Sequence, residues 1–504
     1  MADASADQPP IFAAGAKLLV GAVLLAAIWF RLWDLGRLPG INGDEAWYGV
    51  QAQRLIAGSG GELRTPTGNV PGLFHLGSLA ALHTVFSPSG FLLRLPTLLS
   101  SLVAMVLVYV TAKRFFGRSE AIAALVLMAC LPVNIAYART GWDPSHAPMF
   151  VLGAAYAALD RRRLLAALLF ALALANHPAA LFTAPFLVLA LLGSERAVGT
   201  WRPAVLRSLV FAGLLLLAIL LSLTLSPNST HYVVPAKMMS RLFDPDQWLA
   251  FGIGFVRLLS GQAIYESIAG GGFGAALRTV DMLTAALLLA LVAAGSFAAI
   301  RRRNWLAGGV LLGWAASLFS LFLIAGGWAL EPGMERFAFP LVSLTILAIA
   351  VAIGLVVRSV RPIVPAASLG LLCAALLLGF RQHYFVPLER GASRPSAGQW
   401  VGYPNLNGAA LARIEAIAGP GRSIIVVEDW WIRWPLAYAT TDSRFEVRDS
   451  SEAREGNYWV AYRGGPMDWA LARQGNFQLR SSVSSSDGLN GLNIWSRKPK
   501  PARP

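Results

Sequence analysis

Ile41-Asn-Gly-Asp-Glu-Ala-Trp-Tyr-Gly49 directly follows the first strongly apolar segment of the chain, where a membrane protein usually places an interfacial loop. Two adjacent carboxylates, Asp44 and Glu45, stand in it between a glycine and two aromatic residues. Charges beside a bilayer are costly, so an acidic pair here is a candidate functional site. A capped interfacial helix, with Asp44 as N-cap and Glu45 in the first turn, explains the stretch equally well in isolation.

The composition around this stretch is that of a polytopic membrane protein. The chain has 504 residues, of which 56% are hydrophobic and 14% are charged, and its mean hydropathy is +0.56. This profile excludes a soluble domain of this size. The net charge of +15 does not indicate a nucleic-acid partner, because the basic residues lie in short clusters between apolar runs. Cys130 and Cys373 lie within apolar runs, which predicts buried thiols and neither a disulfide nor a metal site.

Apolar runs long enough, or nearly so, to cross a bilayer recur along the chain and predict about eleven transmembrane helices. The first run is expected to be a retained anchor, because the preceding residues are acidic and a signal peptide begins with a basic region. The expected spans are about Ile11–Phe30, Phe91–Val110, Ala121–Tyr137, Pro144–Leu159, Leu164–Ala175, Pro178–Leu192, Leu206–Leu225, Met282–Ile300, Trp305–Ala325, Phe337–Val357 and Ile363–Phe380. The third to fifth of these are short for a full span.

Between the spans, residues 45–86 are too apolar for a free loop and too polar for a span. They predict helices lying in the outer interface. Residues 226–281 form the longest outer connection and contain the glycine-rich segment Gly270–Gly274, so a long binding loop or lid is expected there. Together, residues 1–381 are expected to form the membrane domain.

After this region the sequence becomes polar and rich in glycine and proline, which predicts a small α/β domain over residues 382–496 and a basic tail over 497–504. Strands are expected at Ser423–Val427, Tyr458–Tyr462, Phe477–Val483 and Leu492–Ser496, with helices at Leu406–Ala418 and Asp468–Arg473. Its tryptophans are expected to form a core or a lipid-facing edge more readily than a sugar-binding surface. The domain is expected to contribute no catalytic group.

Further candidate site residues occur at the outer ends of the spans. Asp143 follows an outer turn, where it can act in catalysis and also cap the helix beginning at Pro144. Arginines near the outer face can bind an anionic head group or extend harmlessly to the interface. The histidines show no metal-ligand spacing, so no metal site is expected. The candidate substrate-binding residues are Arg336, Arg94, Arg139, His75, His146 and Glu335.

These motifs, in this order, resemble the GT-C membrane glycosyltransferases, and within them the group that contains protein O-mannosyltransferases and the lipid A aminoarabinose transferase. Asp44-Glu45 is similar to the family's acidic pair in the first outer loop, and Arg94-Leu-Pro96 to the motif that opens its second span. Arg139 with Asp143, and Arg336-Phe-Ala-Phe-Pro340, are similar to two further outer-face motifs. Val70-Pro71-Gly72 departs from the Lys-Pro-Pro of many relatives, which leaves the donor and acceptor open.

The resemblance implies a polyprenyl-phosphate-sugar donor and a lipid, glycan or protein acceptor, in the cell envelope and on a pathway such as that of lipopolysaccharide. We therefore expect an inverting glycosyltransferase of the bacterial inner membrane, a hexosyl- or pentosyltransferase with Asp44, Glu45 and Asp143 as catalytic residues. No cofactor and no nucleic acid are expected, and a divalent cation is left open. The alternatives are a polytopic transporter or flippase for a lipid-linked or anionic substrate, and a non-catalytic assembly factor.

The basic clusters predict the orientation of the chain. Clusters such as Arg161-Arg162-Arg163 and Arg301-Arg302-Arg303 fall in every second connection. Cytoplasmic loops carry the excess of Lys and Arg, so these connections and the N-terminus are expected in the cytoplasm, and Asp44 and the C-terminal domain outside it. Reporter fusions at Arg162 and Arg302 should report cytoplasm, and fusions after Gly398 should report the outer side. A cytoplasmic signal from the C-terminal fusion would contradict this orientation.

Overall fold

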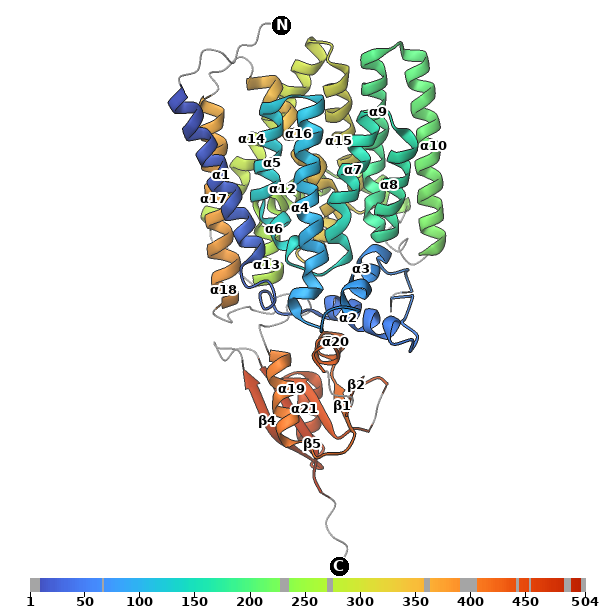
Figure 1. The fold of residues 1–504 in the computed structure, drawn as a ribbon, viewed down its shortest axis with the longest axis vertical. Helices are drawn as coiled ribbons and strands as arrows, with labels where there is room; N and C mark the ends of the chain where they lie inside the picture. The colour runs from blue at the N-terminus through green and yellow to red at the C-terminus, as the bar shows by residue number, and fades with distance from the viewer. Residues whose placement is uncertain are drawn as a thin grey trace, which may run out of the picture.

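The computed structural model describes residues 10–65, 68–226, 235–269, 275–357, 363–389, 406–440, 444–452, 455–484 and 491–499. A bundle of long helices forms one part of the molecule, and a five-stranded sheet with its own helices lies beyond one end of the bundle (Figure 1). Helix α1, Pro10–Leu32, begins at the opposite end of the bundle. The predicted architecture, a polytopic helical membrane protein with a small C-terminal α/β domain, is confirmed.

Every apolar run that the sequence predicts as a span forms helix. After α1 the helices of the bundle are α4 Gly90–Phe115, α5 Arg118–Cys130, α6 Pro132–Ala138, α7 Ala147–Leu159, α8 Arg163–Asn176, α9 Ala184–Val198, α10 Trp201–Leu225, α14 Ala275–Arg301, α15 Trp305–Ile324, α16 Phe339–Val357 and α17 Ile363–Phe380. Within the described ranges, six helical segments are long and apolar enough to cross a membrane, or eight if each of two bent pairs is one span. The expected count of about eleven spans is therefore not confirmed.

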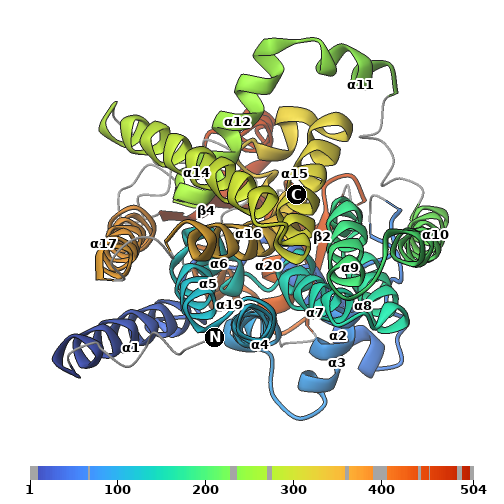
Figure 2. The ribbon, with the colours of Figure 1, turned by 90° about the horizontal axis from the view of Figure 1, so that it is seen from above.

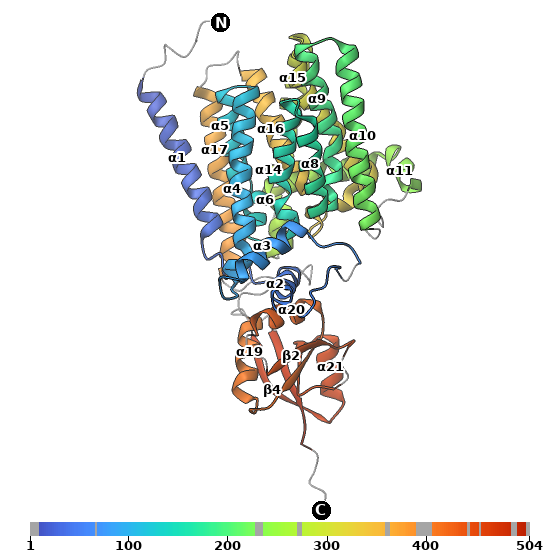
Figure 3. The same ribbon diagram turned by 45° about the vertical axis from the view of Figure 1, so that its right-hand side comes forward.

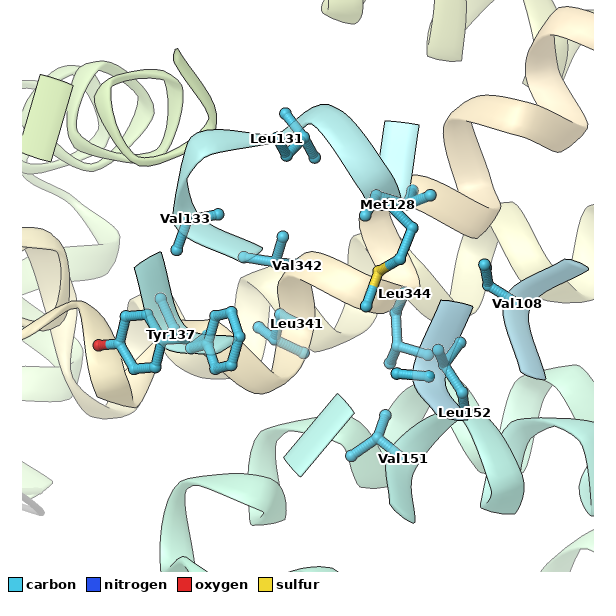
Figure 4. Close-up of a cluster of buried hydrophobic side chains, with 14 of the residues drawn as sticks. Val108, Met128, Leu131, Val133, Tyr137, Val151, Leu152, Leu341, Val342 and Leu344 are labelled. Atoms are coloured by element: carbon cyan, nitrogen blue, oxygen red, sulfur yellow. The ribbon is translucent and has the colours of Figure 1, made fainter. Parts of the chain in front are cut away.

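Helix α16 lies at the centre of the bundle. In its most apolar stretch 89% of the residues are buried, against 17% in α10, which lies at the edge (Figure 2). Figure 4 shows side chains of α4, α5, α7 and α16 meeting in the core, among them Met128, Leu152 and Leu344. Since lipid tails are as apolar as leucine, such contacts stabilise the bundle through close packing.

Two buried arginines satisfy the ends of neighbouring helices. Arg31, near the end of α1, donates to the carbonyls of Met128 and Ala129 at the end of α5. Arg139, just after α6, donates in return to carbonyls at and beyond the end of α1. Its acceptors are Phe30, Arg31, Trp33 and Leu38, at 2.7–3.1 Å. The last carbonyls of a helix have no partner within it, so guanidinium groups are suitable caps where water is absent.

The interfacial segment is helical as predicted. It forms α2, Gly43–Ile56, and α3, Leu73–His83, which lie across the end of the bundle nearest to the C-terminal sheet (Figure 3). The N-cap of α2 is Asn42 and not Asp44. The Asn42 side chain accepts from the backbone N–H of Glu45, and Glu45 accepts from the backbone N–H of Asn42, which is a complete capping box.

The prediction of a long outer loop over residues 226–281 is wrong for most of this range. They contain α11 Pro235–Leu242, α12 Pro245–Ser260 and α13 Gln262–Ala269, and α14 begins at Ala275. Asp244 caps α12, and Gly261, at φ 91°, ends it and permits a 77° bend into α13. The glycine run Gly270–Gly274 lies outside the described residues.

The expected boundary of the C-terminal domain, residue 382, lies within a continuous helix. Helix continues from α17 through Arg381–Phe385 into α18, Val386–Glu389, and the next described element is α19, Leu406–Ile417. The strands are β1 Ser423–Val427, β2 Phe445–Asp449, β3 Tyr458–Tyr462, β4 Phe477–Ser484 and β5 Gly491–Arg497, in the order β2-β1-β3-β5-β4. β1 is parallel to β2 and β3, whereas β5 is antiparallel to β3 and β4.

Four of these five strands match the prediction, and α21, Pro466–Arg473, matches the second predicted helix. The sequence analysis missed β2 and α20, Trp430–Ala439, which contains Pro435. Trp434, Trp459 and Trp495 are buried, so the core interpretation of the tryptophans holds for them. Helix α20 lies between the sheet and α2 (Figures 1 and 3).

Candidate active site

Solvent exposure divides the nine candidate site residues into two groups. Asp44, Asp143 and Arg336 are half-buried, and their side chains remain accessible. The other six are buried, with exposed fractions of 0–3%: Glu45, Arg94, Arg139, His75, His146 and Glu335. A residue that contacts substrate must be reachable, so the first group forms the candidate active site and the second group supports it.

Glu45 and Arg94 form a fully buried ion pair. The Arg94 Nε and Nη2 donate to the two Glu45 carboxylate oxygens at 2.9 and 3.0 Å, which is the bidentate geometry that guanidinium favours. Arg94 also donates to the carbonyls of Leu35 and Gly40. The backbone N–H of Gly141 donates to Glu45 as well. This pair therefore joins α2, α4, the segment after α1 and the loop that carries Asp143.

Two histidines continue this buried network. His75 Nε2 contacts the carbonyl oxygen of Gly141 at 2.8 Å and must donate to it, since a carbonyl only accepts. His75 Nδ1 then accepts from His146 Nε2 at 2.9 Å, and His146 Nδ1 accepts from the Ser100 hydroxyl at 2.6 Å. Burial lowers the pKa of His75 to about 4, in keeping with this neutral arrangement. Both histidines are buried, and their hydrogen bonds hold the loop in place.

Asp143 begins a 3₁₀ turn, Asp143–His146, at the end of that loop. The Tyr48 hydroxyl accepts from the backbone N–H of Gly72 at 2.8 Å and is hydrogen-bonded to the Asp143 carboxylate. The Asn176 amide donates to the Asp143 carbonyl. The sequence analysis did not assign Tyr48 to the site. The one feature of the sequence that could have indicated a role for Tyr48 is its position three residues after Glu45 in the same helix.

Asp44 occupies the first turn of α2, where the helix dipole favours a negative charge. Its Oδ1 accepts a hydrogen bond of 3.2 Å from the indole Nε1 of Trp430, the first residue of α20. The C-terminal domain therefore supplies a group to the site, which the sequence analysis did not expect. Nothing in the order of residues connects Trp430 with a carboxylate 386 positions earlier.

Arg336 lies in the 3₁₀ turn Glu335–Phe337, before α16. Its guanidinium carbon is 5.2 Å from the ring centre of Trp142 and 5.1 Å from that of Phe337, and its charge acts on both Asp44 and Asp143. Glu335 points inward instead and is hydrogen-bonded to Ser267 of α13. Burial raises the pKa of Glu335 to about 7.

The two accessible carboxylates have raised pKa values. Burial raises the pKa of Asp143 to about 8, and the negative charge of Asp44 contributes to this rise. Burial also raises the pKa of Asp44, which Arg336 and the Trp430 hydrogen bond lower in part. Two carboxylates and one arginine in mutual electrostatic contact can exchange a proton and hold an anion. Among the described residues no group of three His, Cys, Asp or Glu side chains could hold a metal ion.

The family described as dolichyl-phosphate-mannose-protein mannosyltransferase matches this chain over residues 74–226. The match includes Arg94, Asp143 and both site histidines, and it excludes Asp44 and Arg336. No curated protein matches the chain.

Among solved structures, the chain is similar to ArnT from Cupriavidus metallidurans bound to undecaprenyl phosphate. The TM-score is 0.53 at 15% identity, over 96% of this chain and 98% of that one. An oligosaccharyltransferase from Archaeoglobus fulgidus matches with a TM-score of 0.48 at 14% identity, over 94% of this chain and 72% of that one.

The chain thus has the fold of the ArnT structure. The resemblance to the GT-C group that contains protein O-mannosyltransferases and ArnT, expected from the motifs, is confirmed by the family match and by the ArnT fold. Both comparisons point to glycosyltransferases and neither points to a transporter.

The buried pair yields a test of its supporting role. Glu45→Gln removes one charge and leaves the Arg94 guanidinium buried without its partner, which should lower the free energy of unfolding by about 3–5 kcal/mol. Adding Arg94→Met removes the stranded charge and should restore part of the stability. Thermal unfolding in detergent measures both effects. The control is Glu62→Gln. Glu62 forms an ion pair with Arg54 that is exposed to solvent, with 3.4 Å between Arg54 Nη1 and Glu62 Oε1. Equal unfolding temperatures for Glu45→Gln and this control would show that the pair is not a structural tie.

Proposed function

We propose that this protein is an inverting glycosyltransferase that takes a sugar from a polyprenyl-phosphate donor. The observation that carries the proposal is the meeting of Asp44, Asp143 and Arg336, the three accessible charged residues of the candidate site, at the end of the bundle that faces the C-terminal domain. The similar fold of ArnT, whose structure is a complex with undecaprenyl phosphate, supports the donor class.

In the proposed step an acceptor hydroxyl attacks the anomeric carbon of the donor sugar. Asp44 takes the hydroxyl proton as the new C–O bond forms. The bond from the anomeric carbon to the phosphate oxygen breaks, and its electron pair leaves with the polyprenyl phosphate. One displacement inverts the anomeric centre. Burial raises the pKa of Asp44, which makes its carboxylate a better proton acceptor than that of an ordinary aspartate.

Asp143 has a different role in this proposal. Its pKa of about 8 keeps much of it protonated at neutral pH, so it can donate a hydrogen bond and is a weak competitor for the acceptor proton. Tyr48, hydrogen-bonded to Asp143, holds that side chain in place. We assign to Asp143 the positioning of the acceptor.

Arg336 holds the phosphate of the donor and stabilises the charge that develops on it as the sugar departs. Guanidinium binds phosphate through two parallel hydrogen bonds and stays charged under all relevant conditions. The proposal assigns no step to a cofactor or a divalent cation, since Arg336 supplies the positive charge that the leaving phosphate needs.

The site is proposed to face the outside of a bacterial cytoplasmic membrane, with the N-terminus in the cytoplasm. The basic clusters of the sequence support this orientation. The acceptor is proposed to be a lipid, a glycan or a protein that reaches the site between the bundle and the C-terminal domain. Comparing envelope glycans of a deletion strain and its parent would identify the product that is lost.

The base assignment is tested by Asp44→Asn, which keeps the size of the side chain and removes its basicity. Losing a general base costs about 100- to 10,000-fold in rate, so transfer from radiolabelled polyprenyl-phosphate sugar should be lost while donor binding remains. Asp246→Asn, an exposed acid at the start of α12, is the control and should be fully active. If Asp44→Asn keeps more than about a tenth of the turnover, the base is to be sought at Asp143.

The phosphate assignment is tested by Arg336→Lys, which keeps the charge and removes the bidentate geometry. Donor affinity should fall, and turnover should fall with it, because the same contact stabilises the leaving group. Binding of polyprenyl phosphate and the rate of transfer are both measured. Arg381→Lys, at an exposed ion pair with Glu389, serves as the control. Normal affinity and rate in Arg336→Lys would mean that Arg336 is only an interfacial anchor.

A further inference from the structure

Helix α20 of the C-terminal domain packs directly on α2, the helix that carries Asp44 (Figure 3). Two glycines of α2 make the contact close. A Cβ atom on Gly43 would lie 2.6 Å from Trp430 Cδ1, and one on Gly49 would lie 2.5 Å from the ring of Tyr438. Neither distance is tolerable for a real side chain, so the two helices meet here with no room for a methyl group. The contact is therefore specific in its position along both helices.

The Tyr438 hydroxyl fixes the other end of this contact. It accepts from the backbone N–H of Ser89 at 3.0 Å and donates to the Ser89 carbonyl at 3.1 Å, at the N-cap of α4. The first turn of α20 is thus bound to α2 through Trp430, and its last turn is bound to the start of α4 through Tyr438. The domain is held to the bundle by hydrogen bonds with defined partners as well as by apolar packing.

Contacts within the C-terminal domain fix the position of Trp430. Asp429, the N-cap of α20, accepts from the backbone N–H groups of Trp431 and Ile432, and the Tyr462 hydroxyl of β3 donates to the same carboxylate. The Trp430 ring also stacks on Trp47, with centres 6.5 Å apart and planes inclined by 25°. The direction of its indole N–H is therefore set by the sheet and by α2 together.

We infer that Trp430 is a positioning residue, which orients the Asp44 carboxylate through the indole N–H and thereby makes docking of the C-terminal domain a requirement for full activity. The inference rests on the proposed role of Asp44. Oδ1 is occupied by Trp430, whereas Oδ2 has no hydrogen bond to any residue within the described ranges. The bond thus presents Oδ2 to the acceptor hydroxyl in one fixed rotamer.

Trp430→Phe removes the N–H and keeps most of the stacking on Trp47. One lost hydrogen bond to a carboxylate should lower the turnover number by about 10-fold. Burial raises the pKa of Asp44 and the Trp430 bond lowers it, so the variant should have a higher pKa at Asp44. A base acts only when deprotonated, and the acid limb of the pH profile of kcat/KM should therefore move to higher pH. Trp469→Phe, which removes an exposed indole bonded to the Gly464 carbonyl, should change neither quantity.

A second variant moves Trp430 without altering it. Gly43→Ala places a methyl group against the indole and should shift the pH profile in the same direction, whereas Gly77→Ala, which meets no atom within 4 Å, should not. Binding of undecaprenyl phosphate to each variant shows that it is folded. If Asp44→Asn is inactive, two results for Trp430→Phe would overturn the inference. One is a turnover number and a pH profile equal to those of the wild type, and the other is a lower turnover number without a shift of the acid limb. Activity of Asp44→Asn would instead overturn the proposed role of Asp44 as the base, and this inference with it.

Discussion

The buried contact between Glu45 and Arg94 determines the geometry of the end of the bundle that faces the C-terminal domain. Two opposite charges withdrawn from solvent are stable only if each finds complete hydrogen-bonding. The partners available are the backbone groups of Leu35, Gly40, Asn42 and Gly141, so satisfying the pair brings four separate segments to one point. Asp44 and Asp143 are positioned as neighbours of these anchored groups. The accessible carboxylates thus acquire their mutual arrangement from a pair of charges that never meets solvent.

The sequence was sufficient to predict most of the bundle helices and strands and insufficient to predict which face each polar residue occupies. Adjacent residues in a helix point about 100° apart, so one member of Asp44-Glu45 had to face the interior, and the pattern alone did not say which role that member would take. Apolar periodicity located the bundle helices and four strands because those signals are local. Helix α20 was missed because its run of tryptophans with an internal proline resembles no regular helix.

The remaining differences come from contacts between distant residues. An arginine that binds phosphate and one that binds helix-end carbonyls have the same sequence environment, a span end rich in apolar residues. Arg139 proved to be of the second kind, with its donors directed to backbone oxygens. Arg94 donates to the Glu45 carboxylate and to two backbone oxygens, while Arg336 remains accessible. The same holds for His75, whose Nε2 donates to the Gly141 carbonyl. Only the three-dimensional positions of the acceptors separate these cases.

The caps on α1 have a consequence for how the protein is made. The carbonyls of Phe30 and Trp33 are satisfied by a guanidinium more than 100 positions further along the chain. As the ribosome delivers the chain, α1 enters the membrane long before Arg139 exists, and until then its outer end must keep water or lipid head groups at those oxygens. Packing of the α5–α6 segment against α1 then replaces those partners with the Arg139 guanidinium and encloses the end of the helix in the protein.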